Sequence, residues 1–186
     1  MGTIKTTNIE PIADNGTVTL GSSGDTFTLG SGVVQSNLMY PAFNVELSST
    51  QTGVSDNVAT KVNFNTELLD TDNAYDNSTN YRFTVPSGAD GKYYIEGNVQ
   101  VANATANNMQ NVKIYIYKNG SSVRQASYGL ANATGYFNNM SIVTTSILDL
   151  VATDFIQIYA KSNTASGDVK FESSPQSYFL GYRIGS

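Results

Sequence analysis

Short runs in which apolar and polar residues alternate occupy the chain from about residue 41 onward. This alternation places every second side chain on one face of the backbone and is typical of half-buried β-strands. The runs are rich in Val, Ile, Thr, Tyr and Phe, which favour strands. Strands are predicted at residues 42–47, 60–65, 81–85, 91–101, 111–118, 121–126, 137–150, 154–161, 168–172 and 178–184. The regular spacing of these strands predicts an all-β sandwich or jelly roll.

Clusters of Gly, Asn, Asp and Ser separate the predicted strands. Turns are predicted at residues 48–57, 70–80, 87–91, 102–108, 119–120, 130–135 and 162–167. The clearest of them is the pair Asn119 and Gly120, which follows the alternating run at 113–118. An Asn-Gly pair between two alternating runs marks a tight hairpin.

Residues 15–32 have a different organisation, a nine-residue repeat. The sequence Thr-Val-Thr-Leu-Gly at 17–21 returns as Thr-Phe-Thr-Leu-Gly at 26–30. Each copy is a short alternating segment that ends in a Gly/Ser turn, so its two apolar side chains lie on one face. These side chains are Val18 and Leu20 in the first copy and Phe27 and Leu29 in the second.

Two interpretations of this repeat stay open. One is a flexible Gly/Ser/Thr linker. The other is an ordered, intertwined stalk, because short repeats bury almost nothing alone and need neighbours to complete a core. The strict register of the four apolar residues favours the stalk, in which they contact the same segment of other chains. The sequence therefore predicts an N-terminal arm at 1–38 and a globular domain at 39–186.

Composition narrows the functions that this chain can have. It contains no His, Cys or Trp, and 13% of its residues are charged. Nucleophilic sites that need His or Cys, zinc sites built from these residues, and disulfides are therefore excluded. A net charge of −5 and a pI near 4.5 argue against an electrostatic grip on nucleic acid or anionic lipid. No apolar run approaches the roughly 20 residues that span a bilayer, and we expect no signal peptide.

Three acidic residues, Asp70, Asp72 and Asp76, fall within one predicted turn. Carboxylates at this spacing can ligate calcium or act as an acid/base pair. The glycine and the final glutamate of the helix-loop-helix calcium motif are absent, and no predicted helix flanks the turn. The sequence therefore favours a solvated turn over a calcium contact, and a calcium contact over catalysis. We accordingly expect no enzyme activity, no cofactor and no resident metal.

Amide and aromatic side chains gather in the loops between the central strands. Asn107, Asn108, Tyr128, Asn132 and Tyr136 are the candidate ligand-binding or receptor-binding residues. Such a mixture suits sugar binding or an uncharged protein–protein rim. Ordinary turn chemistry, from residues that tolerate the left-handed backbone conformation, is the favoured alternative.

Several motifs occur in the order of a known family. Phe64, Asp70 and Tyr75 follow an aromatic-x5-Asp-x4-aromatic spacing. Further matches are Phe83, Gly91-Lys92-Tyr93-Tyr94-Ile95, Lys118-Asn119-Gly120, the segment 147–158 with its Thr153-Asp154 pair, and Ser177-Tyr178-Phe179-Leu180-Gly181-Tyr182. Residues 40–186 thereby resemble the C1q/TNF-like jelly-roll superfamily. The sequence departs from the pattern at Ile95, Gly97 and Thr153, where the family has Phe, an aromatic residue and Gly.

The resemblance implies a jelly-roll head that assembles into a homotrimer around a three-fold axis. At 114–117, alternation puts Ile114 and Ile116 on one face and Tyr115 and Tyr117 on the other. Our hypothesis is that one set fills the sandwich and that the tyrosines face a neighbouring subunit. The alternative is that both tyrosines are ordinary half-exposed strand residues.

The Gly/Thr/Ser repeat before this head is similar to the N-terminal parts of virion surface proteins of tailed bacteriophages. A collagen-like Gly-X-Y period is absent. The resemblance implies a non-enzymatic protein on the virion surface, a capsid decoration protein or short head fibre, which residues 1–38 attach to other virion proteins. The alternative is a tail-fibre tip, a receptor-binding adhesin that recognises host surface glycans. A depolymerase is a third reading, with no visible catalytic constellation, and we expect neither nucleic-acid binding nor membrane insertion.

Overall fold

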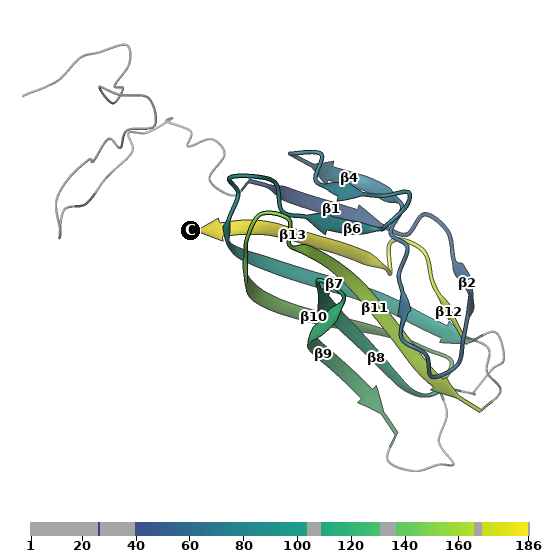
Figure 1. Cartoon of the computed structure of the whole chain (residues 1–186). Coiled ribbons are helices and arrows are strands. Elements are labelled where there is room, and N and C mark those ends of the chain that lie inside the picture. The colour runs from purple at the N-terminus through teal and green to yellow at the C-terminus, as the bar shows by residue number, and fades with distance from the viewer. Residues whose placement is uncertain (1–25, 27–39, 104–108, 131–136, 166–168, 186) are drawn as a thin grey trace, which may run out of the picture. The chain divides into compact units, whose positions relative to one another are not determined.

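The computed structural model describes residue 26 and residues 40–103, 109–130, 137–165 and 169–185. These residues form two antiparallel β-sheets packed face to face (Figure 1). Every regular element in the described part of the chain is a strand, which confirms the predicted all-β sandwich. The described residues include no helix long and apolar enough to cross a membrane.

Seven strands in the described ranges form the first sheet, sheet A. Its main order is β4 (Thr66–Asp70), β1 (Ala42–Glu46), β13 (Tyr178–Gly185), β7 (Gly91–Asn103) and β10 (Asn139–Leu150). Near the end of β7, the short strands β12 (Val169–Phe171) and β2 (Gln51–Val54) continue the sheet. β10 pairs with β7 from Gly91 to Ala102 and is the edge strand on that side of the sheet.

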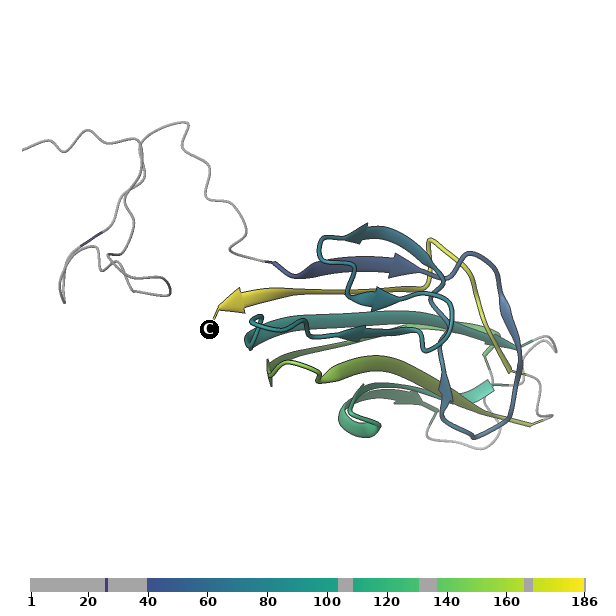
Figure 2. The same ribbon diagram turned by 45° about the horizontal axis from the view of Figure 1, so that its top comes forward.

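The second sheet, sheet B, runs in the order β5 (Tyr75–Asp76), β6 (Arg82–Thr84), β11 (Phe155–Thr164), β8 (Met109–Lys118) and β9 (Ser121–Gly129). The short strand β3 (Thr60–Lys61) also pairs with β11. After β7 the chain crosses to sheet B for β8 and β9, returns for β10, crosses again for β11 and returns for β12 and β13 (Figure 2). Strands far apart in sequence thus become neighbours, as in a jelly roll.

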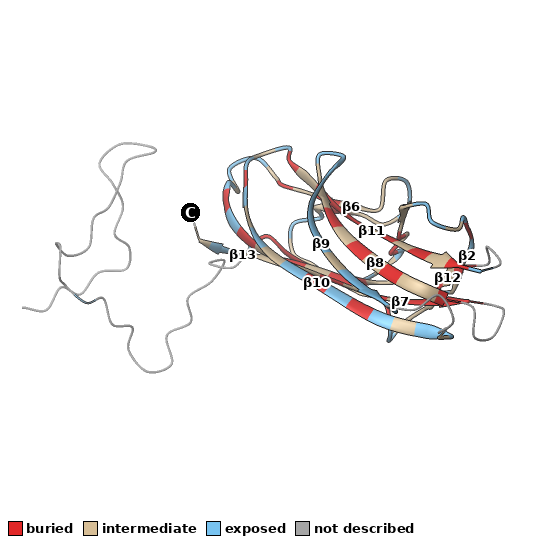
Figure 3. Ribbon diagram, turned by 90° about the horizontal axis from the view of Figure 1, so that it is seen from below, coloured by how far each residue is buried: buried red, intermediate tan, exposed pale blue. Residues whose placement is uncertain are grey.

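The hydrophobic core lies between the sheets and follows the alternation of the sequence. On β7, Tyr93, Ile95 and Val99 are buried, whereas the residues between them are more exposed, apart from the inward Gly97. Buried and half-buried residues also alternate along β8 in Figure 3, where Ile114 and Ile116 point inward. Full burial of each such large apolar side chain contributes about 1.5–3 kcal/mol.

One end of the core is an aromatic cluster centred on Phe43. Its ring centroid lies 4.5 Å from that of Phe83, 4.8 Å from Phe179 and 5.7 Å from Tyr75. The Tyr75 hydroxyl donates a hydrogen bond of 3.2 Å to the Phe64 carbonyl. The aromatic residues of the family-like spacing therefore meet here and join the two sheets.

Gly97 fills the position where the family pattern has an aromatic residue, and the packing explains this departure. A Cβ atom at Gly97 would lie 2.6 Å from Cδ1 of Ile158, which belongs to the opposite sheet. Gly181, on the neighbouring strand, leaves similar room for Ile95 and Phe43. In this chain isoleucine and phenylalanine side chains from other strands occupy the space that a larger residue would need.

The sequence pattern missed three strands. β2 and β5 lie within the predicted turns at 48–57 and 70–80, and β4 lies between predicted elements. These strands are short, Leu68 and Leu69 of β4 are exposed, and the pairing of β4 with β1 shifts register between Asn44 and Val45. Their existence depends on pairing with distant strands rather than on a local apolar alternation.

Apart from residue 26, the predicted arm falls outside the described ranges. Val18, Leu20, Phe27 and Leu29 are not described, and neither is the boundary expected between residues 38 and 39. The intertwined stalk and its apolar contacts stay predictions.

Candidate functional site

The outer face of sheet A carries a cluster of tyrosines around one carboxylate. Tyr94 donates a hydrogen bond of 2.5 Å to Oε2 of Glu96, and Tyr178 donates one of 2.7 Å to Oε1. The rings of Tyr94 and Tyr182 lie 5.4 Å apart. Hydrogen bonding to Glu96, with some burial, raises the pKa of Tyr94 to about 12. These hydroxyls therefore stay protonated and hold the carboxylate in place.

Exposed apolar side chains continue this face onto β10. Val143 and Ile147 are 50% and 61% exposed. Ile147 lies directly across from Tyr94, and Leu180 of β13 lies across from Glu96. We call the set Tyr94, Glu96, Val143, Ile147, Tyr178, Leu180 and Tyr182 the sheet A face. It combines apolar area with tyrosine hydroxyls, a composition typical of protein–protein interfaces.

The sandwich is open along β9 and β10. Nearly all of β9 is exposed, as its colour in Figure 3 shows, and within the described ranges it pairs with β8 alone. Ala126, Met140 and Leu148 pack against the core but are only partly buried. Val123 is 45% exposed. This open edge has apolar side chains and unpaired strand backbone, both of which favour association with another chain.

The outer face of sheet B carries the tyrosines singled out in the sequence. Ile114 and Ile116 lie in the core, and Tyr115 and Tyr117 are half-buried on the opposite face. Tyr117 stacks on Tyr159 of β11 with ring centroids 4.2 Å apart. Whether Tyr115 and Tyr117 face a neighbouring subunit stays a prediction.

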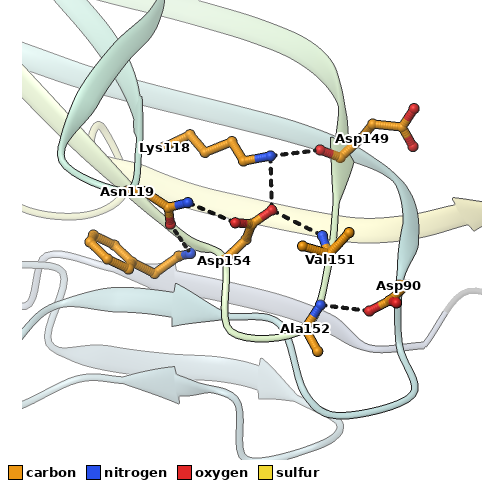
Figure 4. Close-up of polar contacts among 8 residues, drawn as sticks. Asp90, Lys118, Asn119, Asp149, Val151, Ala152 and Asp154 are labelled. Atoms are coloured by element: carbon orange, nitrogen blue, oxygen red, sulfur yellow. Dashed lines mark hydrogen bonds and ion pairs between the residues drawn. The ribbon is translucent and has the colours of Figure 1, made fainter.

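A polar clasp joins two turns at one end of the sandwich (Figure 4). The carboxylate of Asp154 lies 2.8 Å from the Lys118 ammonium and accepts hydrogen bonds of 2.7 Å from Asn119 Nδ2 and 2.9 Å from the Val151 amide. Burial opposes ionisation of Asp154, but these bonds hold its pKa below its usual range. The clasp joins the Lys-Asn-Gly and Thr-Asp motifs, which lie over 30 residues apart in the sequence. Its contacts hold the two turns together.

The backbone of these two turns explains another departure from the family pattern. Asn119 and Gly120 have φ values of 50° and 80°, which confirms the predicted tight hairpin. Thr153 has a φ of 74°, in a region that β-branched residues rarely adopt. Glycine adopts this conformation without steric cost, whereas Thr153 adopts it under strain.

Two carboxylates of the acidic turn accept hydrogen bonds from nearby backbone amides. Asp70 accepts hydrogen bonds from the amides of Ala74 and Tyr75, at 3.1 and 2.9 Å. Asp76 accepts bonds from the amides of residues 78–80 and from the Asn80 side chain, and these hold its pKa well below the usual range. Asp72 is exposed. Among the described residues, no group of three or more His, Cys, Asp or Glu side chains is placed to hold a metal ion. The preference for a solvated turn over a calcium contact stays a prediction.

The candidate ligand-binding loops are only partly described. Asn107, Asn108, Asn132 and Tyr136 lie outside the described residues. Tyr128 packs edge-on against Phe137, with ring centroids 5.8 Å apart, and borders a surface hollow of about 470 Å³. That hollow lies over the paired ends of β8 and β9.

Sequence reasoning missed the sheet A face. The predicted strands at 91–101 and 137–150 have apolar or aromatic residues at both phases of their alternation, including Tyr94, Val143 and Ile147. A strand that is half-buried in one domain needs only one apolar phase. The apolar residues at the second phase of these strands were therefore the signal in the sequence that indicated a further contact surface.

Comparisons with known proteins agree with this architecture. No protein-family model and no curated protein sequence matches the chain. Among solved structures, Eiger TNF from S. frugiperda superposes with a TM-score of 0.60 at 10% identity, covering 81% of this chain and 95% of that one. The globular domain of zebrafish complement 1qA protein gives a TM-score of 0.50 at 17% identity, covering 77% and 97%. The fold is a C1q/TNF-like jelly roll. At these identities the likeness concerns the fold alone.

Proposed function

We propose that this chain is a non-enzymatic homotrimeric head, in which the sheet A face of one subunit packs against the open edge of the next. The observation that carries the proposal is the exposure of Val143 and Ile147 beside the Tyr94–Tyr182 pair. Large apolar side chains exposed beside tyrosines on one sheet face are typical of protein–protein contact surfaces. The sequence contains no His or Cys, so a role that depends on neither residue as nucleophile or base is supported.

A three-fold assembly needs two different patches on each subunit. In a cyclic trimer the contact is heterologous, so one surface of each chain meets another surface of its neighbour. The sheet A face and the open edge are two such surfaces, and both border β10. Their tyrosines and apolar side chains suit an interface whose core is dry and whose rim is polar.

Replacing Ile147 with lysine is expected to dissociate the trimer. A charge at a packed interface is left without a partner and costs several kcal/mol, which is enough to shift assembly at micromolar concentrations. Light scattering coupled to size exclusion should give about three times 19.9 kDa for the parent chain and one times that mass for Ile147→Lys. Circular dichroism should show that the variant keeps its strands.

The matched variant tests the sequence-based hypothesis. Tyr115→Lys with Tyr117→Lys places two charges on the outer face of sheet B, and we expect it to leave the trimer intact. If this variant dissociates and Ile147→Lys does not, the interface lies on sheet B. A parent chain of single-chain mass would refute the trimer altogether.

We further propose that these heads are displayed on the surface of a tailed-phage virion, with residues 1–38 as the attachment arm. The Gly/Thr/Ser repeat before a C1q/TNF-like head, and the low charge of the chain, support this proposal. A capsid decoration protein or short head fibre is the first form of it. The alternative is a tail-fibre adhesin, and the lysines and tyrosines on the outer face of sheet B favour it.

Deleting residues 1–38 is expected to leave a folded head that no longer joins the particle, because the strands from Ala42 onward form two sheets around a hydrophobic core. Particles assembled with the full-length or the shortened chain can be compared by immunogold labelling, which also shows whether label lies on capsid or tail. Incorporation of the shortened chain at the full-length level would contradict the anchoring role.

A further inference from the structure

Charge is segregated between the two sheets. The strands of sheet B carry six cationic residues and one carboxylate: Lys61, Arg82, Lys113, Lys118, Arg124, Lys161 and Asp76. The strands of sheet A carry five carboxylates and three cations: Glu46, Glu67, Asp70, Glu96, Asp149, Lys92, Lys170 and Arg183. Asp76 lies on β5, the end strand of sheet B, and its carboxylate accepts hydrogen bonds from residues 78–80. Four of these cations, Lys61, Arg82, Lys113 and Lys161, lie at outward positions, so the outer face of sheet B is cationic in a chain of net charge −5. Arg124 lies opposite the inward Ile116, and Lys118 lies opposite the inward Ile156 and pairs with Asp154.

On this face, outward residues that lie opposite each other on two neighbouring strands form successive pairs, and we call each pair a rung. The rungs are aromatic, cationic or amide in character. Across β11 and β8 the outward pairs are Gln157 with Tyr117, Tyr159 with Tyr115, Lys161 with Lys113, and Asn163 with Asn111. Lys61 of β3 lies beside Tyr159 on the other side, so the aromatic rung has lysines in two directions. Alternate residues along a strand are separated by roughly 6.6 Å, so the four rungs extend over about 20 Å.

The lysine rung works against the stability of the free domain. Like charges directly opposite each other on antiparallel strands are destabilising. Lys161 donates a hydrogen bond of 2.9 Å to Asn57 Oδ1, and neither lysine has a carboxylate partner among the described residues. A bound anion would relieve this repulsion.

A hollow of about 470 Å³ lies beside the lysine rung. It is lined by Gln110, Asn111, Lys113, Ser127 and Tyr128, together with Gly129 and Leu130. Within the described chain, Oδ1 of Asn111 is buried and accepts no hydrogen bond, which is costly unless a donor arrives. The hollow thus offers a cation, an acceptor, a hydroxyl and an aromatic ring at one end of the rungs.

We propose that the outer face of sheet B binds an anionic polysaccharide, with a carboxylate of the sugar at Lys113 and Lys161 and sugar rings along Tyr115, Tyr117 and Tyr159. The hydroxyls of a saccharide match the amides and phenols of the neighbouring rungs. Charge complementarity favours an anionic sugar over a neutral one. This binding function goes beyond the proposed assembly and does not depend on it.

The arrangement of the rings favours a saccharide over a nucleic acid. Single-stranded nucleic acids bind by stacking their bases on free aromatic faces. Here Tyr117 and Tyr159 stack on each other, and Tyr115 meets Tyr117 edge-on at 6.1 Å, so little ring face is left for stacking. A base depends on that face, whereas the hydroxyls of a saccharide need only the phenols and amides of the rungs. The net charge of −5 also opposes a polyanion of such high charge density.

Titration calorimetry on the full-length chain tests the site with hexagalacturonate as the probe. We expect binding that weakens as salt rises, and an affinity for neutral maltohexaose at least tenfold lower. Lys113→Gln combined with Lys161→Gln should weaken hexagalacturonate binding by about tenfold. The same variant should unfold at an equal or higher temperature, because the repulsion is gone. Lys92→Gln, at an exposed lysine of sheet A, is the matched control and should bind like the parent.

Three outcomes would overturn the proposal. One is an unchanged affinity for hexagalacturonate in the double lysine variant. Another is maltohexaose binding as tight as hexagalacturonate binding, which would make the lysines irrelevant. The third is tighter binding of a twelve-residue oligothymidylate, which would assign the face to nucleic acid. Failure of any of these tests leaves the trimer measurements with Ile147→Lys unaffected.

Discussion

Replacing Phe43 with alanine is expected to lower the free energy of unfolding by about 3–5 kcal/mol. The ring is 2% exposed and contacts Phe83, Phe179 and Tyr75, which come from both sheets. Its removal leaves a cavity that the surrounding rings cannot fill, because they are held on separate strands. Denaturant unfolding followed by tyrosine fluorescence, at one fixed chain concentration, measures the loss.

Two further variants show whether the loss in Phe43→Ala comes from lost packing or accompanies any substitution. Phe43→Leu keeps most of the volume and should lose about 1–2 kcal/mol. Val58→Ala truncates a side chain that is 52% exposed and should change stability by less than about 0.5 kcal/mol. A Phe43→Ala loss as small as that of Val58→Ala would show that the aromatic cluster does not join the sheets.

Replacing Asp154 with alanine should cost about 2–4 kcal/mol. The change leaves the Asn119 amide and the Val151 backbone amide without their acceptor, and it leaves the Lys118 ammonium with the Asp149 carbonyl but no carboxylate. The matched control is Asp149→Ala, whose carboxylate is 79% exposed and 3.7 Å from Lys92, and it should cost less than about 1 kcal/mol. Equal losses in the two variants would mean that the clasp does not hold the turns together.

The clasp should also make stability depend on pH in the acid range. The pKa of Asp154 is lower in the folded chain than in the unfolded one, where it is near 3.9. Its stabilisation is therefore fully present above that ordinary pKa and is lost as pH falls through the folded pKa. Melting temperatures measured from pH 6 to pH 2 should fall less steeply for Asp154→Asn than for the parent. The remaining slope in that variant should include Asp76, whose pKa is lowered in the same direction.

Local pattern was enough to predict most of the strands and one turn in full. Burial alternates over most of the long strands β7, β8 and β10, so their positions could be predicted without a partner. The Asn119-Gly120 hairpin followed from the backbone preferences of two residues. These features depend on interactions within a few residues, which a sequence displays directly.

The surfaces could not be predicted in the same way. Tyr94, Ile147 and Tyr182 come from three strands, and only their register places them on one face. Lys113 and Lys161 are nearly fifty residues apart, and their opposition across β8 and β11 is visible only in the pairing. The sequence analysis singled out Tyr115 and Tyr117 but had no means of finding Tyr159, their stacking partner.

For this protein, the order of apolar and polar residues was enough to predict an all-β chain and the positions of its long strands. Composition excluded chemistry that depends on His or Cys. The tertiary structure decided which strands pair, and with them the aromatic cluster at Phe43, the clasp at Asp154 and the division of charge between the two sheets. The physical reason is that alternation sets the side to which a residue points, whereas its neighbours across the sheet depend on long-range pairing and on the packing of the whole core.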